Sequence, residues 1–186
     1  MTRRLAALAL LAFFCGAAEA ATPVLRLQDT ANQPVQIVMA KAEATVVIFI
    51  SAVCPVSNAY HDRYQRMASD YKDRGVQFVF VNSNDNETLA EVKEHMRAAE
   101  FSFPVYKDWK NVVADKLRAS MTPEAFLLNR KGEVIYHGAV DDSKNEARVK
   151  VEALRDAINA TLAGKSASRN ELKAFGCTIH RYRKAS

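Results

Sequence analysis

Val46-Val47-Ile48-Phe49-Ile50-Ser51-Ala52-Val53-Cys54-Pro55 is the stretch of the chain that decides its fold. It begins with five β-branched or aromatic residues in a row, a pattern typical of a strand that is buried on both faces. It ends with a proline, which favours the first turn of a helix because it has no backbone N–H to leave unpaired there. We therefore expect a buried strand, then Cys54 at the junction, then a helix.

The residues that follow predict a helix and a second buried strand. Apolar side chains recur every three or four residues, as on one face of a helix, at Val56, Tyr60, Tyr64, Met67 and Tyr71. Gly75 ends this helix, and the apolar run from Val76 to Val81 predicts a strand. A strand, a helix and a strand within about forty residues form a right-handed crossover unit, so the two strands should be parallel.

The rest of the chain predicts further alternation. The polar turn 82–86 should cap a helix over residues 87–99, and Asn111 should cap a third, short helix. Strands at 125–128 and 134–136 should form a hairpin through 129–132, and a last helix over 151–162 should end at Gly164. Residues 165–186 are polar and irregular. These elements predict an α/β fold with a central mixed β-sheet flanked by helices on both faces.

Length and composition agree with one domain. The chain has 186 residues, of which 49% are hydrophobic and 25% charged, which excludes a disordered protein. Its net charge of +5 is mild, and basic residues do not alternate with aromatic ones, so nucleic acid is not an expected partner.

The first twenty residues have the pattern of a signal peptide. Arg3 and Arg4 precede the short apolar run 5–15, and Ala18-Glu19-Ala20 is a cleavage pattern of the A-x-A type. No apolar segment is long enough to span a bilayer, so stable membrane insertion is not expected. We therefore expect a signal peptide at 1–20, a folded domain at 21–164, a polar C-terminal tail at 165–186, and export to the periplasm.

Export would leave two cysteines, because Cys15 lies within the signal peptide. Cys54 and Cys177 can then be a structural disulfide or a redox couple, and composition does not choose between them. Cys54 lies where a strand meets a helix, and backbone N–H groups at a helix N-terminus stabilise a thiolate. The alternative is a buried, inert cysteine. Pro123 precedes another predicted strand, where its peptide bond can be cis or trans.

Several segments together resemble a known family. Ser51-Ala52-Val53-Cys54-Pro55 after a buried strand, Thr122-Pro123 before another, and the order of elements are similar to the thioredoxin superfamily. More narrowly, 54–58, 122–126, 136–142 and the terminal Gly176-Cys177-Thr178-Ile179 resemble the peroxiredoxin-like redoxins, the family of alkyl hydroperoxide reductases and thiol-specific antioxidants. The resemblance covers about residues 24–180 and implies a thioredoxin-like fold.

The resemblance also implies roles for individual residues. Cys54 falls on the family's reactive cysteine, and Pro123 falls on the cis-proline, preceded by Thr122, that packs beside it. Ser51 stands where a thioredoxin has the first cysteine of its CxxC, and its hydroxyl could hydrogen-bond the Cys54 sulfur. With that cysteine missing, Cys177 is the candidate resolving cysteine, and His180, Arg181 and Arg183 near it would favour its thiolate.

Three functions remain open from the sequence. The leading one is an exported thiol–disulfide oxidoreductase that acts on protein thiols and disulfides or on a small thiol reductant. The second is a thiol peroxidase that reduces hydroperoxides through a Cys54 sulfenic acid. Val47 stands where peroxiredoxins have a proline, and their peroxide-polarising arginine has no counterpart near Pro123, which favours the first. The third is a non-catalytic binding module with a structural Cys54–Cys177 disulfide.

No cofactor or metal is expected. His61 lies two turns beyond Cys54 and could suggest a metal pair, but one cysteine and one histidine are fewer ligands than a stable site needs. His95, His137 and His180 are expected at the surface.

The cleavage pattern gives a first prediction. The mature chain should begin at Ala21, because Ala18 and Ala20 provide the small residues that signal peptidase requires. N-terminal sequencing of the protein from a periplasmic fraction measures this. A pool of folded protein that keeps Met1 would contradict the predicted signal peptide.

Overall fold

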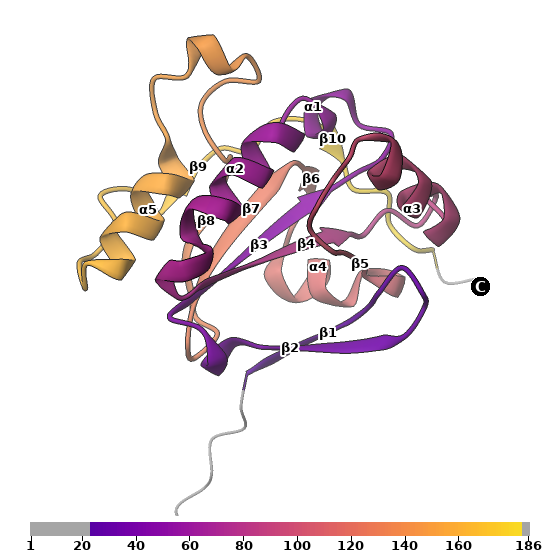
Figure 1. Ribbon diagram of the computed structural model, residues 1–186, viewed down its shortest axis with the longest axis horizontal. Coiled ribbons are helices and arrows are strands. Elements are labelled where there is room, and N and C mark those ends of the chain that lie inside the picture. The colour runs from indigo at the N-terminus through magenta and orange to yellow at the C-terminus, as the bar shows by residue number, and fades with distance from the viewer. Residues whose placement is uncertain (1–22, 184–186) are drawn as a thin grey trace, which may run out of the picture.

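The computed structural model describes residues 23–183, so the predicted signal peptide lies outside the described residues. Its centre is an eight-stranded β-sheet (Figure 1). Across this sheet the strands lie in the order β2 (Pro34–Val38), β1 (Val24–Gln28), β5 (Val105–Lys107), β4 (Val76–Asn82), β3 (Ala44–Ile50), β7 (Glu124–Asn129), β8 (Val134–Gly138) and β9 (Glu171–Leu172).

The sheet is mixed, as predicted. Strands β3, β4 and β5 are parallel, whereas β7 pairs antiparallel with both β3 and β8. The β3–β4 register places Ile50 opposite Asn82. The carboxyl ends of these two strands therefore meet at one edge of the sheet, where the Cys54 segment begins.

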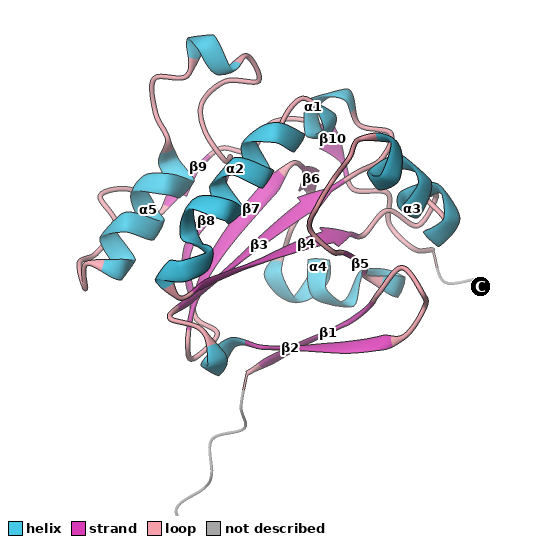
Figure 2. Cartoon of the chain, viewed as in Figure 1, coloured by secondary structure: helices cyan, strands magenta, loops and turns pink. Residues whose placement is uncertain are grey.

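Helices cover both faces of the sheet, which confirms the predicted layers (Figure 2). They are α1 (Pro55–Asn58), α2 (His61–Tyr71), α3 (Leu89–Ala98), α4 (Val112–Leu117) and α5 (Ala153–Leu162). Side chains alternate along β3: Val46, Ile48 and Ile50 pack with α2, α3 and α5, while Val47 and Phe49 pack with α4. All seven β3 residues are buried, as the apolar run predicts.

Three local predictions were wrong in detail. The helix expected over Val56–Tyr71 is broken, because Tyr60 N–H bonds to the Ser57 carbonyl in a tight turn before α2 begins. Thr88, rather than the turn 82–86, caps α3 through a capping box with Glu91. Asn111 occupies the cap position of α4, but its side chain donates to the Ser83 carbonyl instead.

The side chain of Asp108, rather than that of Asn111, caps the N-terminus of α4. Its carboxylate accepts hydrogen bonds from the backbone N–H groups of Val113 at 3.0 Å and Ala114 at 2.9 Å. These are two of the donors that a helix N-terminus leaves unpaired. A carboxylate therefore caps the helix from four residues before its first turn.

Residues 165–183 include two short strands, whereas their polar sequence predicted only an irregular tail. They add β9 to the main sheet, and β10 (Cys177–Thr178) pairs antiparallel with β6 (Met121–Thr122). Ile179 is 2% exposed and packs in the core on the α4 side of the sheet. Composition failed here because a few scattered apolar residues, Leu172, Phe175 and Ile179, pack against the core from a segment that is otherwise polar.

Gly176 allows the segment to cross the Thr122–Pro123 loop. Its φ of +148° lies in a region that L-residues rarely adopt, and a Cβ at this position would overlap the Thr122 carbonyl. The close approach between the two backbones therefore requires glycine immediately before Cys177.

No helix within residues 23–183 is long and apolar enough to cross a membrane.

The docked segment should not depend on the disulfide. Ile179 N–H bonds to the Ser120 carbonyl at 2.9 Å, and His180 N–H bonds to Asn84 Oδ1 at 2.8 Å. In a Cys177→Ser chain these two amides should stay protected from hydrogen exchange. Ile179→Ala should remove that protection and lower the free energy of unfolding by about 3 kcal/mol, because it empties a buried site. Rapid exchange of both amides in Cys177→Ser alone would show that only the disulfide holds the segment.

Candidate active site

Cys54 lies at the junction of β3 and α1, as predicted. It occupies the N-cap position of α1, and its sulfur accepts a hydrogen bond from the Ser57 N–H at 3.4 Å. The residue is 1% exposed. Because α1 has only four residues, the directed Ser57 N–H, rather than the dipole of a long helix, is the group that favours a thiolate here.

The Thr122–Pro123 loop packs against Cys54. The peptide bond between Thr122 and Pro123 is cis, as the family resemblance implied. The Cys54 sulfur lies 3.2 Å from the Thr122 carbonyl oxygen, and Thr122 Oγ1 donates to the Cys177 carbonyl at 3.3 Å. Thr122 thus contacts both cysteine-bearing segments.

Cys54 and Cys177 form a disulfide. Their Cα atoms are 6.0 Å apart although 123 residues separate them in the sequence. β10 pairs Cys177 directly with Thr122, so the backbone delivers the second sulfur to the first. Cys177 is partly exposed whereas Cys54 is buried. A sulfur that exchanges with this disulfide therefore reaches Cys177 more easily.

Ser51 lies in the site but does not play the expected part. Its hydroxyl donates to Glu87 Oε1 at 2.6 Å, and its oxygen accepts from the N–H groups of Val53 at 3.2 Å and Cys54 at 3.1 Å. A serine hydroxyl has a single proton, which here is directed at Glu87. The prediction that Ser51 hydrogen-bonds the Cys54 sulfur was therefore wrong.

Glu87 is the residue that sequence reasoning missed. It is 2% exposed, and its other oxygen accepts from Ala52 N–H at 2.7 Å and from Asn82 Nδ2 at 2.8 Å. The sequence suggested only that Glu87 begins a helix. The useful signal was positional: Asn82 ends a strand parallel to β3, so the residues after it lie beside Ser51.

The charged residues of the tail also differ from expectation. Arg181 was expected to favour a Cys177 thiolate, but its guanidinium pairs with Asp115 at 2.7 Å and donates to the Ala119 carbonyl. Its charge therefore fastens the tail to the residues around α4.

His61 and His95 pack against each other. The rings of His61 and His95 lie 5.3 Å apart, and burial together with the neighbouring His95 lowers the pKa of His61 to about 4. His95 was expected at the surface but is partly buried, with Nε2 3.2 Å from Asn58 Oδ1. Within residues 23–183 no three histidine, cysteine or carboxylate side chains come together in the manner of a metal site.

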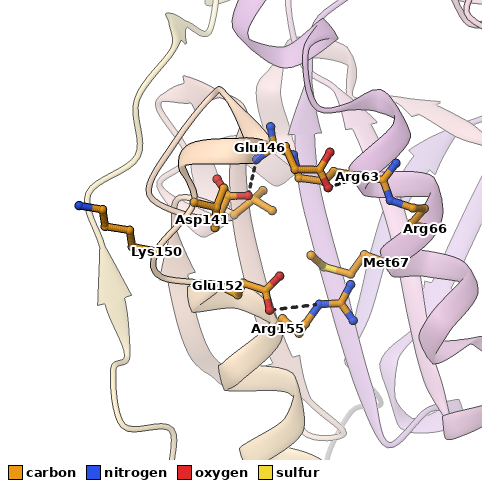
Figure 3. Close-up of a pocket in the computed structure, with 10 residues that line it drawn as sticks. Arg63, Arg66, Met67, Asp141, Glu146, Lys150, Glu152 and Arg155 are labelled. Atoms are coloured by element: carbon orange, nitrogen blue, oxygen red, sulfur yellow. Dashed lines mark hydrogen bonds and ion pairs between the residues drawn. The ribbon is translucent and has the colours of Figure 1, made fainter.

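A cavity of about 240 Å³ lies between α2 and the loop before α5 (Figure 3). Six of its charged side chains form three ion pairs: Arg63 with Asp141, Arg66 with Glu146 and Arg155 with Glu152. Arg63 also donates to the carbonyls of Ser143 and Lys144. These bonds hold the loop against α2, so the 136–142 segment singled out from the sequence has a structural role through Asp141.

The chain matches a known protein family over most of its length. The model of the Redoxin family matches residues 17–157. This chain belongs to the Redoxin family. As a redoxin, it is 28% identical over 133 residues to the sporulation thiol-disulfide oxidoreductase A of Bacillus subtilis, a match that covers 68% of this chain and 81% of that protein.

Solved structures agree with the family. A hypothetical protein from Sinorhizobium meliloti superposes with a TM-score of 0.78 at 30% identity, covering 88% of this redoxin and 93% of that chain. A putative thioredoxin from Neisseria meningitidis superposes with a TM-score of 0.62 at 18% identity, covering 79% and 93%. The fold is thioredoxin-like.

The environment of Cys54 predicts an acidic thiol. In a Cys177→Ala chain its pKa should lie below the ~8.5 of a free cysteine, because the Ser57 N–H stabilises the thiolate. Alkylation rates measured between pH 5 and pH 10 (roughly the range that brackets the thiol pKa) give the value. The same chain in denaturant is the control and should return the ordinary pKa. Equal midpoints in the folded and denatured chains would contradict a reactive Cys54.

Proposed function

We propose that this redoxin is an exported thiol–disulfide oxidoreductase, with Cys54 as the nucleophile and Cys177 as the resolving cysteine. The observation that carries the proposal is the Cys54–Cys177 disulfide, with Thr122 in contact with both cysteine-bearing segments. A relative named as a thiol-disulfide oxidoreductase supports it. Export rests on the signal-peptide pattern, and an oxidising compartment suits a cycle that returns to the disulfide.

The reaction would proceed by two exchanges. The Cys54 thiolate attacks one sulfur of a partner disulfide, forms a mixed disulfide and releases the first partner thiolate. The Cys177 thiolate then attacks Cys54 Sγ, which releases the second partner thiolate and closes the Cys54–Cys177 bond. The partner gains two electrons and, on protonation, two protons, and the enzyme loses them. Thr122 holds the Cys177 backbone next to Cys54 throughout the second step.

Reduction of the Cys54–Cys177 disulfide would begin with attack on Cys177. A reducing thiolate attacks the more exposed Cys177 sulfur, and Cys54 leaves as the thiolate that the Ser57 N–H stabilises. A thiol of low pKa is the better leaving group. A second thiol of the reductant then frees Cys177. The difference in exposure between the two cysteine residues thus gives each a separate role in the cycle.

The surface beside Cys54 suits a protein partner. Val53 is 68% exposed, and it lines an open hollow of about 610 Å³ together with Ala52, Ala90 and Ala98. Apolar surface next to a reactive sulfur offers contact area to a partner chain. Protein thiols or disulfides are therefore the favoured partners, with small thiols as alternative reductants.

Mixed disulfides and the reduction potential test the proposal. Cys177→Ala should accumulate Cys54-linked partners on a non-reducing gel, and the matched Cys54→Ala chain should accumulate none. In the native chain the docked tail holds Cys177 in place and favours the disulfide. We therefore expect a potential towards the reducing end of the exchange range of about −120 to −270 mV, measured against glutathione or dithiothreitol.

Other results would favour one of the two alternative functions. A potential below about −300 mV with no trapped partner would leave a binding module with a structural disulfide. A Cys54 sulfenic acid that forms rapidly with hydroperoxide in Cys177→Ala, without trapped proteins, would favour the thiol peroxidase.

A further inference from the structure

A chain of buried polar side chains runs beneath the disulfide, and we call Lys107, Asn82, Glu87 and Ser51 the buried relay. Each of these residues is 1–2% exposed. They come from β5, β4, the turn before α3 and the end of β3, so the relay exists only in the folded sheet. The reaction proposed above uses none of them directly.

Hydrogen bonds converge on Glu87 from both ends of the relay. Lys107 Nζ donates to Asn82 Oδ1 at 2.8 Å, and Asn82 Nδ2 donates to Glu87 Oε2 at 2.8 Å. Glu87 Oε1 in turn accepts the Ser51 hydroxyl, whose oxygen receives the Cys54 N–H. The Asn82 amide thus bridges a buried cation and a buried carboxylate. The carboxylate acts only as an acceptor, since three donors point at it.

The same lysine also supports the segment that carries Cys177. Lys107 Nζ donates to the Asn84 carbonyl at 2.6 Å, and Asn84 Oδ1 accepts the His180 N–H at 2.8 Å. His180 follows Cys177 by three residues. One buried charge pair therefore holds the Cys54 segment at one end and the docked tail at the other.

We propose that Glu87 is a positioning residue for the Cys54 thiol, which it acts on through Ser51 while Lys107 balances its charge. This rests on the proposed function, in which Cys54 reacts as a thiolate. Two physical effects follow. Glu87 draws the Ser51 proton away from the sulfur, and its negative charge disfavours a second negative charge on Cys54. The relay thus restrains the thiolate, while the Ser57 N–H stabilises it.

The two charges of the buried relay should shift the pKa of Cys54 in opposite directions. Removing the Glu87 charge should favour the thiolate, and removing the Lys107 charge should disfavour it. Burial lowers the pKa of Lys107, and nearby acids oppose that shift. The acids that act on Lys107 are Glu87, Asp85, Asp108 and Glu91.

Alkylation of Cys54 in two variants tests the proposal. In the Cys177→Ala chain, Glu87→Gln should lower the Cys54 pKa and raise the alkylation rate below that pKa by about threefold to tenfold. Lys107→Met should change the rate in the opposite direction. In the chain with both cysteines, Glu87→Gln should also shift the equilibrium with glutathione towards the reduced form, since it stabilises the thiolate.

Glu94→Gln is the matched control. Glu94 is an exposed carboxylate on α3 that pairs with Arg97, so this variant removes the same charge from the surface. It should leave the alkylation profile unchanged. A purely structural role for Glu87 would loosen the loop in both relay variants, so rates that rise in both, or that stay within twofold of the parent, would overturn the proposal.

A measurement on a chain that keeps Glu87 and Lys107 tests the proposal even if Glu87→Gln does not fold. In the Cys177→Ala chain, the carbon-13 signal of the Glu87 carboxyl group should shift as Cys54 titrates, and the Glu94 signal should not. An unmoved Glu87 signal would overturn the proposal. Failure of the proposed function remains distinguishable, because a protein that traps no partner and has a potential below about −300 mV can still show this coupling.

Discussion

Parallel pairing between β3 and β4 is the constraint on which the site depends. Because Ile50 lies opposite Asn82, both strands end at the same edge, and the residues after them must share one small space. Ser51 and Cys54 follow the first strand, while Glu87 follows the second. Backbone N–H groups released at the end of β3 need acceptors once buried, and Glu87 and Ser51 supply them. The reactive loop is thus fixed both by its own Ser51 and by Glu87, which lies in the turn after the neighbouring strand.

The position of the second sulfur depends on a different part of the chain. β10 and β6 bring Cys177 to Thr122 by backbone pairing, and Ile179 anchors the segment in the core. Gly176 permits the crossing because it lacks a Cβ. The tail therefore has its own attachment to the domain. In a reduced enzyme it would keep Cys177 close to Cys54, which raises the effective concentration of the resolving thiol.

Features of the fold that depend on periodic patterns over several residues could be predicted from the sequence. The buried strands, the mixed sheet and the position of Cys54 at a strand–helix junction follow from periodicity and proline placement, and the structure agrees. The sequence indicated Cys177 as the candidate resolving cysteine but did not predict how the tail docks, since the scattered residues Leu172, Phe175 and Ile179 that pack against the core leave no periodic signal. It also misassigned the Ser51 proton, because the acceptor lies 36 residues away and becomes a neighbour only through the sheet. Side-chain networks across strands require the register, which composition does not contain.

The buried charges bear on whether the disulfide is a catalytic couple or a structural one. Removing Glu87 and Lys107 from water carries a desolvation penalty of several kcal/mol per ion, and well-packed apolar residues often replace such pairs at no loss of stability. A disulfide that served only to close the fold would need its two segments held in place, which neutral hydrogen-bonding side chains can do without buried ions. A thiol that must alternate between a leaving group and a nucleophile does gain from such ions, because a fixed charge nearby controls how much thiolate is present. The buried relay is therefore easier to explain beneath a reactive Cys54 than beneath a permanent disulfide.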